Sequence, residues 1–272
     1  MSSHTLPKRQ NRLRNVIGSV FAAVCIYSVG TYVILPALWR HYEHNPKLEH
    51  SPKVTQTSEG ISGDPLNVGL VGTQKEVVGA LLAAGWYPAD PITLRSGIGI
   101  ARSVLLKRSY PTAPVSSLYL WGRKQDLAFE LPVGKTAKKR HHVRLWQSNE
   151  VSDNGRPVWL GSATFDTSVE LSHYTGQITH RIDADIDEER DTFMSYLEKA
   201  HQINSEYQVT GVGATLQGRN GGGDYYYTDG EQTIGVLTAN SQIQTAPIAK
   251  LPNPVPVEVK NKVWSSLRHM FN

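Results

Sequence analysis

The stretch RHHVRLWQSNEVSDNGRPVWLGSATF, residues 140–165, indicates the fold class. Its middle contains Asp153-Asn154-Gly155, and Asn-Gly between two apolar runs is a strong short-range signal for a β-hairpin. Residues 140–147 and 158–165 carry the β-branched and aromatic side chains that are typical of strands. We therefore predict that these two segments pair as an antiparallel hairpin.

Further strand and helix signals surround this hairpin. Thr73 and Glu76 have the spacing of a capping box and predict a helix that ends at Gly85. A second helix is expected over residues 188–201, with Asp187 as its N-cap. Strands are expected at residues 65–70, 117–121, 127–133, 178–186, 207–215 and 225–237, the last folded at Thr228-Asp229-Gly230, with a hairpin turn at 219–224. Few helices among many strands indicate an α+β fold with a largely antiparallel sheet.

An apolar segment near the N-terminus predicts a membrane anchor. Residues 16–39 read VIGSVFAAVCIYSVGTYVILPALW and carry no charge. As a helix they would extend about 36 Å, enough to cross the ~30 Å hydrocarbon layer. The run is longer than the ~7–15 apolar residues of a secretory signal peptide, and it ends at Trp39, which suits the membrane interface. We therefore expect an uncleaved transmembrane helix.

The charges around this helix predict its orientation. Lys8, Arg9, Arg12 and Arg14 precede it, whereas basic residues after it are sparse. The positive-inside rule then places residues 1–15 in the cytoplasm and the rest of the chain on the other side of the membrane.

Composition divides the remainder into three parts. Residues 40–62 are polar, rich in Ser, Pro, Glu and His, and are expected to be a linker. Residues 63–245 carry the strand and helix signals of one domain. Residues 246–272 form a proline-rich tail with an amphipathic stretch, 259–271, that we expect to dock on the domain in preference to a membrane surface.

Several function classes lack support. The formal net charge is +4, and four basic residues lie in the first fourteen positions, so no basic face for nucleic acid is expected. Cys25, the single cysteine, lies in the apolar segment, which leaves the domain without a thiol nucleophile or cysteine metal ligand. The glycines at 211–218 miss the dinucleotide-binding spacing, and no Walker, Gly-x-Ser-x-Gly or Ser-x-x-Lys sequence occurs.

The segment HRIDADIDEER, residues 180–190, is rich in carboxylates. On a strand, Asp183, Asp185 and Asp187 would share one face. Three neighbouring carboxylates repel one another unless a cation neutralises them, and a divalent cation such as Ca²⁺ or Mg²⁺ prefers oxygen ligands. The alternative is a solvated strand that runs into a capped helix.

The strand at 140–146 is the second polar segment. His142, Arg144 and Trp146 would line one face and His141 the other, because adjacent residues of a strand point in opposite directions. This face could hold a phosphate or carboxylate, or it could pair with the acidic segment at 183–187 in a purely structural role. The candidate binding residues are therefore His141, His142, Arg144, His180 and Arg190. The candidate ligands of a divalent metal are His142, His180, Asp183, Asp185 and Asp187.

The order of several runs resembles a known family. GDPLNVGLVGTQKEVVGALLAAGW (63–86), LYLWGRKQDLAFE (118–130), RHHVRLW (140–146), VWLGSATFD (158–166) and THRIDADIDEERD (179–191) are similar to the LssY C-terminal domain, over roughly residues 63–240. That family is bacterial, and its domain often follows membrane regions, including lipid-phosphatase-like ones. The resemblance implies a bacterial membrane protein but no particular reaction. A Pro-Ser-Gly-His phosphatase signature is absent from this sequence.

Two functions follow as hypotheses. The first is a non-catalytic binding or assembly domain in the periplasm, anchored in the inner membrane by residues 16–39, with other envelope proteins as partners and without nucleic acid. The second is a metal-dependent hydrolase of an envelope phosphate or ester, with His142 and His180 beside Asp183 and Asp185. A divalent metal is the one cofactor that these residues indicate. A third hypothesis is that residues 259–271 recruit a partner helix.

Overall fold

The structure, a computed structural model, describes residues 7–35, 37, 48, 51–89, 117–134, 139–171, 178–209, 216–239 and 243–271. Of residues 7–11, 169–171, 178–180 and 216 it describes the backbone alone. The chain divides into two compact units, Met1–Glu43 and His44–Asn272.

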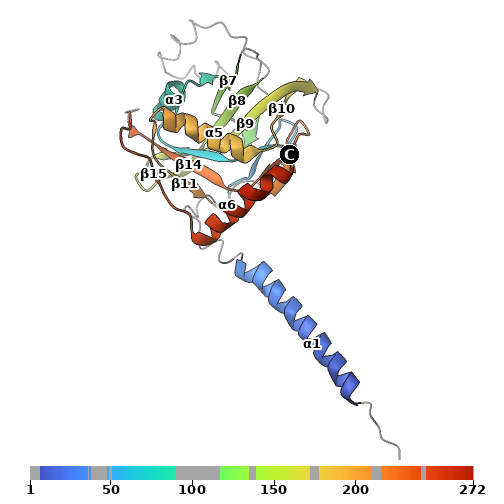
Figure 1. Ribbon diagram of the computed structural model, residues 1–272. Helices are drawn as coiled ribbons and strands as arrows, with labels where there is room; N and C mark the ends of the chain where they lie inside the picture. The colour runs from blue at the N-terminus through green and yellow to red at the C-terminus, as the bar shows by residue number, and fades with distance from the viewer. Residues whose placement is uncertain are drawn as a thin grey trace, which may run out of the picture. The chain divides into compact units, whose positions relative to one another are not determined.

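The first unit is a long apolar helix (Figure 1). Helix α1 (Pro7–Val29) continues directly into a short π-helix, η1 (Gly30–Ile34). Within it, Arg12–Ile34 is 23 residues long and has no buried residue. Such a helix is about 35 Å long, which is enough to cross a bilayer. The predicted apolar N-terminal helix is confirmed, and its length and composition fit both a membrane span and a signal sequence.

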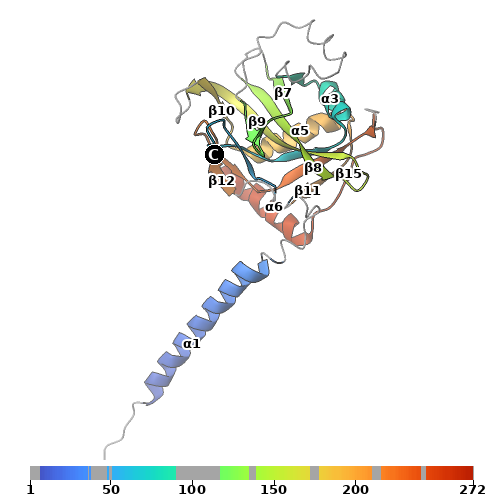
Figure 2. The same ribbon diagram turned by 180° about the vertical axis from the view of Figure 1, so that it is seen from behind.

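The second unit is built on a large β-sheet, which Figure 2 shows from behind. In pairing order its strands are β15 (Ala249–Lys250), β11 (Ile203–Val209), β14 (Gln232–Leu237), β3 (Val68–Val71), β9 (Pro157–Leu171), β8 (Arg140–Val151), β7 (Leu127–Pro132) and β4 (Tyr87–Pro88), with β10 (Ile178–Ile182) also paired to β9. Among the described pairs of this sheet, β14–β3 and β11–β15 are parallel and the others are antiparallel. The predicted α+β class is thus confirmed.

The predicted hairpin is the β8–β9 pair. His142 lies opposite Thr164, and Leu145 lies opposite Gly161. Gly155 in the connecting turn has a φ of 71°, a left-handed conformation that glycine adopts without steric cost. The Asp-Asn-Gly signal therefore located the turn correctly.

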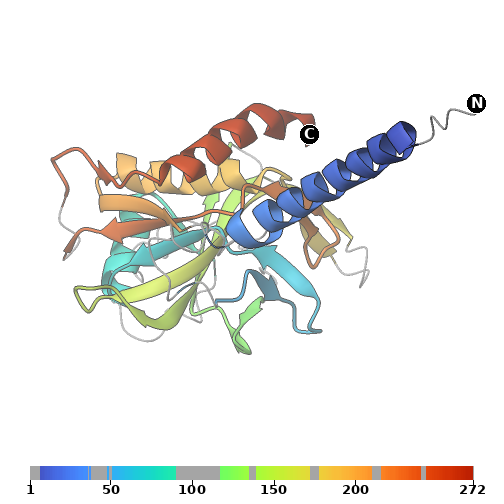
Figure 3. The same ribbon diagram turned by 90° about the horizontal axis from the view of Figure 1, so that it is seen from below.

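Helices and a small sheet cover the two faces of the large sheet. Helices α3 (Gln74–Ala83) and α5 (Ile186–Lys199) pack on one face through a core that includes Val77, Leu81, Phe193 and Leu197. The small sheet has the order β2 (Ser62–Pro65), β1 (Val54–Gln56), β5 (Tyr119–Leu120) and β6 (Arg123–Lys124), and it lies on the side away from α5 (Figure 3). A second core forms there, with Leu48, Leu118, Trp146 and Leu160 among its buried members.

Helices α3 and α5 are both capped at their N-termini by a side chain. The predicted capping box of α3 is present, since Thr73 accepts from the Glu76 N–H and Glu76 accepts from the Thr73 N–H. For α5 the N-cap is Asp185, whose carboxylate accepts from the Glu188 N–H at 3.1 Å. The prediction of Asp187 as N-cap is therefore wrong, and Asp187 lies in the first turn.

Three other segments differ from the sequence-based expectations. Strand β10 ends at Ile182 instead of continuing to residue 186. The expected strand at 225–237 consists of two strands, β13 (Tyr225–Thr228) and β14, which belong to different sheets. Strand β13 pairs with β12 (Leu216–Arg219), and the turn between them is the one expected at 219–224. Strand β1 lies inside the expected linker 40–62, so the folded unit begins before residue 63.

The C-terminal segment packs against the domain. Helix α6 (Val255–Leu267) is followed by a 3₁₀ turn, η5 (Arg268–Phe271), and lies on the same side of the sheet as α5 (Figure 3). Val257 of α6 is fully buried, and Trp264 donates a hydrogen bond to Asp187.

Asn67 ties the sheet to α5, and its replacement tests this packing. Its amide donates to the carbonyls of Ala163 (2.9 Å) and Ile186 (3.2 Å), and its Oδ1 accepts from the Ala163 N–H (2.8 Å). We predict that Asn67→Ala lowers the free energy of unfolding by about 3 kcal/mol, because buried backbone groups lose their partners. Urea unfolding of the full chain in detergent, followed by tryptophan fluorescence, measures this.

Asn154→Ala is the matched control, because Asn154 is exposed in the β8–β9 turn. We expect it to change the free energy of unfolding by no more than about 0.5 kcal/mol. Equal losses in the two variants would contradict the role given to Asn67.

Candidate functional site

The face of the β7–β8–β9 sheet opposite α5 is a layer of buried charges. Arg140, His142 and Arg144 alternate along β8 and point to this face, and each is less than 9% exposed. Arg140 pairs with Glu130 at 2.8 Å. The imidazole Nε2 of His142 lies 3.0 Å from Asp166. The predicted basic strand is therefore matched by carboxylates of the neighbouring strands β7 and β9.

Arg144 completes this layer through the small sheet. Its guanidinium lies 3.1 Å from the carboxylate of Asp64 on β2, which also accepts from the Asn220 amide at 3.2 Å. Burial raises the pKa of Asp64, and the nearby Arg144 opposes that rise. Two hydroxyls of β9, Ser162 Oγ and Thr164 Oγ1, are buried without a hydrogen-bond partner among the described residues. Within this buried layer, Arg140, His142 and Arg144 each lie beside a carboxylate.

The expected pairing of strand 140–146 with the acidic segment 183–187 is wrong. Strand β8 pairs with β7 and β9, and β10 pairs with β9. An anion at His142 and Arg144 would have to displace Asp166 and Asp64. The geometry therefore gives no support to the hypothesis of an anion site on this strand.

His141 points to the other face of the sheet, as the alternation predicts. Its Nδ1 lies 2.8 Å from Glu189 of α5, and its ring packs against Trp86, Phe165 and Tyr196. Burial raises the pKa of Glu189, and the hydrogen bond from His141 opposes that rise. The two histidines therefore do not belong to one site.

Arg190 and Asp187, in the first half of α5, form a second charged cluster with Asp229. Arg190 donates to both carboxylate oxygens of Asp229, at 2.7 and 3.1 Å, and lies 3.3 Å from Asp187. Asp187 also accepts from Thr228 Oγ1 at 2.6 Å and from the Asp229 N–H at 2.8 Å. We call these three charged residues the Arg190 cluster.

Helix α6 is held on the Arg190 cluster. Trp264 Nε1 donates to Asp187 at 2.7 Å. Lys260 Nζ donates to the Asp229 carbonyl at 2.9 Å and forms an ion pair with Glu231. Burial raises the pKa of Asp187 to about 6, with Arg190 opposing the rise and Asp229 adding to it. Burial also acts to raise the pKa of Asp229, but Arg190 overcomes this effect and lowers it.

The predicted metal ligands whose side chains the structure describes are not brought together in one metal-binding group. Asp183 accepts from the Asp185 N–H, Asp185 caps α5, and Asp187 belongs to the Arg190 cluster. His142 is paired with Asp166 in the layer behind the sheet. The side chain of His180 lies outside the described residues. Among the described side chains, no three His, Cys, Asp or Glu residues form a group that could hold a metal ion.

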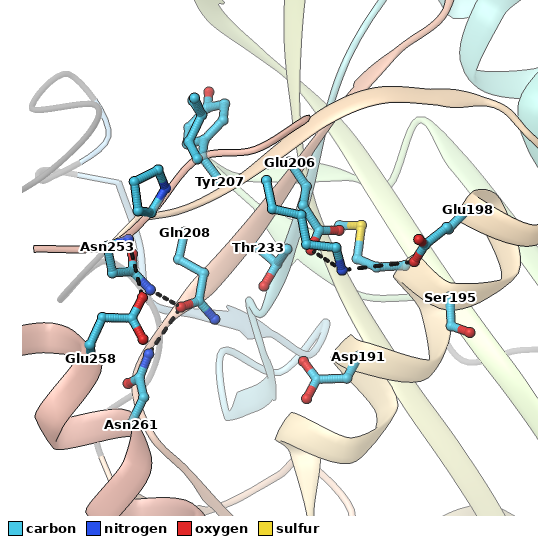
Figure 4. Close-up of a pocket in the computed structure, with 14 residues that line it drawn as sticks. Asp191, Ser195, Glu198, Glu206, Tyr207, Gln208, Thr233, Asn253, Glu258 and Asn261 are labelled. Carbon is cyan, nitrogen blue, oxygen red and sulfur yellow. Dashed lines mark hydrogen bonds and ion pairs between the residues drawn. The ribbon is translucent and has the colours of Figure 1, made fainter. Parts of the chain in front are cut away.

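A groove of about 450 Å³ lies between α5 and α6 (Figure 4). Strands β11 and β14 and the segment at 250–253 supply the rest of its lining. Its polar lining residues are Asp191, Ser195, Glu198, Glu206, Tyr207, Gln208, Thr233, Lys250, Asn253, Glu258 and Asn261. Sequence reasoning missed this groove, because its residues come from distant segments and form no local motif.

Two sets of polar contacts, one at Lys250 and one at Gln208, organise the groove. Lys250 lies 2.9 Å from Glu206 and 3.8 Å from Glu198, and the hydrogen bond that it donates to Glu206 raises the pKa of Lys250. Gln208 Oε1 accepts from the amides of Asn253 at 2.5 Å and Asn261 at 3.0 Å.

The composition of the lining indicates what the groove can do. Four carboxylates face one ammonium group, and no histidine or cysteine is among the described lining residues. Carboxylates, amides and hydroxyls together can donate and accept hydrogen bonds with a neutral or cationic ligand. The groove is therefore suited to bind a neutral or cationic ligand.

The raised pKa of Asp187 predicts a pH dependence of stability. In the unfolded chain this carboxyl ionises near its ordinary pKa of 3.8, whereas in the fold its pKa is about 6. Between these values the folded state binds more protons, so the contribution of Asp187 to the free energy of unfolding falls as pH rises from about 4 to about 6. We predict a fall on the order of 2–3 kcal/mol, which Asp187→Asn removes.

Urea unfolding of the full chain at pH values from 4 to 7 measures this slope for both proteins. Asp153→Asn, in the exposed β8–β9 turn, is the matched control and should keep the wild-type slope. Parallel profiles for wild type and Asp187→Asn would contradict the prediction.

Comparison with known proteins gives one match. The family model described as LssY C-terminus matches residues 48–231, which is more than half of the chain. Searches of curated proteins and of solved structures find no match. The matched region starts at the buried Leu48 and includes the charged layer, the Arg190 cluster and α3 and α5, whereas β14 and α6 follow it. The chain belongs to the LssY C-terminus family.

Proposed function

We propose that this protein is a non-catalytic binding domain, anchored in the bacterial cytoplasmic membrane and exposed in the periplasm. The apolar helix Arg12–Ile34 supports the anchor, and the basic residues before it support the orientation. The chain matches the LssY C-terminus family, and the sequence resemblance to that family implies a bacterial membrane setting.

The observation that carries the binding function is the groove between α5 and α6. Its volume lies within the range of small-ligand sites, about 300–1,000 Å³. The ionisable residues outside it that resemble catalytic groups, such as His141 and His142, are buried and paired with carboxylates. A general base needs access to its substrate, which these histidines lack.

The charges of the groove define the class of ligand. With carboxylates in excess over Lys250, a phosphate or another anion would be repelled. A neutral, hydrogen-bonding ligand or one that carries an amine fits the lining. A polyhydroxylated saccharide of the cell envelope or an amine-bearing peptide has this chemistry.

The topology can be tested with reporter fusions at the C-terminus. We predict that alkaline phosphatase fused after Asn272 is active, because this enzyme matures only outside the cytoplasm, whereas green fluorescent protein at the same point stays dark. Replacing Lys8, Arg9, Arg12 and Arg14 with asparagine should reduce phosphatase activity, because the flanking charge that orients the helix is lost. A fluorescent green fluorescent protein fusion together with an inactive alkaline phosphatase fusion would overturn the proposed orientation.

Site-specific photo-crosslinking tests the groove itself. We predict that benzoylphenylalanine in place of Ser195, which lines the groove, forms an adduct in intact cells. The same amino acid in place of Asn154, in the exposed turn, is the matched control and should form none above background. Mass spectrometry of the adduct identifies the chemical class of the captured ligand.

A second substitution links the adduct to the groove. Gln208→Ala removes the acceptor shared by Asn253 and Asn261, and it should reduce the Ser195 adduct at unchanged protein level. Equal adducts at Ser195 and Asn154, or an adduct indifferent to Gln208→Ala, would contradict binding in the groove.

A further inference from the structure

Helix α6 has an inner face that is fixed to the domain. Val257 is fully buried, and Trp264 contacts both Asp187 and the ring of Tyr227. Arg268, directly after the helix, lies 3.6 Å from Asp185. These contacts determine which side of the helix faces away from the domain.

The outward side of α6 carries a row of apolar residues. Val255, Val259, Val263 and Leu267 recur at every fourth position and are between 42% and 76% exposed. At 100° per residue this row occupies an arc of about 120°. An arc of that width is what a helix normally buries in a core, yet here it is exposed in the domain itself. We call these four residues the outer row.

A polar flank lies beside the outer row. Lys262 and His269 are exposed, with Ser265 on the same side of the helix, and the exposed Glu258 of this side accepts from the Asn253 N–H at the groove. Lysine beside an apolar stripe is the pattern of helices that lie in the interface of a membrane, where the cation meets lipid phosphates. The outer row and this flank therefore fit a lipid surface.

The chain keeps the domain close to such a surface. Eleven peptide steps join Ala37, near the end of the apolar helix, to Leu48, which is buried in the domain core. Fully extended, they reach at most about 40 Å. A compact domain of this size has a radius of gyration of about 17 Å. A tether of this length therefore keeps the domain next to the bilayer that holds the anchor.

We propose that α6 is an interfacial helix whose outer row inserts into the surface of the bilayer that holds α1. This inference rests on the membrane anchor of the proposed function and adds a second, reversible contact with lipid. Insertion of the outer row would fix the orientation of the domain, including the α5–α6 groove, relative to the membrane. The outer row lies outside the family match, which ends at residue 231.

Lipid quenching of a fluorescent probe tests this contact in the full chain. Single cysteines replace Val263 or Leu267 in a Cys25→Ser background, are labelled with the environment-sensitive dye NBD, and the protein is reconstituted into vesicles of phosphatidylethanolamine and phosphatidylglycerol. We expect a blue-shifted emission and a loss of intensity when nitroxide-labelled lipids are included. Ser265→Cys, on the polar flank, should show a smaller loss, and Asp153→Cys, in the β8–β9 turn, should show none.

Three other outcomes would overturn the inference, and each would show which part of it is wrong. A blue shift at Val263 and Leu267 without lipid quenching would mean that protein, such as a second copy of the chain, covers the outer row. An unshifted, unquenched probe would mean that the row stays in water. Carbonate extraction of the same vesicles tests α1 separately: a chain that stays in the pellet with unquenched probes overturns this inference alone, whereas a chain that is released overturns the anchor as well.

Discussion

The architecture of the domain depends on a constraint imposed by Arg190, a guanidinium that is buried on α5. A buried charge is tolerated only when opposite charges and hydrogen bonds replace its water. Asp229 supplies two of these bonds, and Asp187 and the Glu231 carbonyl supply others. Because Asp187 has remaining acceptor capacity, it also takes the indole N–H of Trp264. One buried cation thus determines how α5, the turn after β13 and α6 fit together, and the groove between the two helices depends on this arrangement.

Local chemistry made part of this fold predictable. The Asp-Asn-Gly turn identified the β8–β9 hairpin, and the spacing of Thr73 and Glu76 identified the start of α3, because both signals act within a few residues. The order of the strands was not predictable, since β3 pairs with β14 across most of the chain. The strand predicted to continue through the acidic segment to residue 186 was wrong. Asp183 and Asp185 accept from nearby backbone N–H groups, so the strand ends and the helix begins there.

The candidate site was harder to predict than the fold. His142 and Arg144 look like ligand-binding residues in the sequence. Strand pairing places Asp166 beside His142, and packing of the small sheet on the large sheet places Asp64 beside Arg144. Both are long-range properties of the fold. The groove residues, such as Ser195, Gln208 and Asn261, carry no local signal, because hydrophilic residues on a helix or an outer strand usually only face solvent. They converge only in the folded domain, where α6 contacts β11.

The position of β14 between β11 and β3 also affects how the chain can be made. Thr233 pairs with Val68 at a separation of 165 residues (233 − 68). At a synthesis rate of 5–20 residues per second, β3 waits on the order of ten seconds or more for this partner. During that time one edge of the nascent sheet is unpaired and open to wrong partners. The sheet can therefore close only after β14 has emerged, and a holding chaperone would have its greatest effect in that interval.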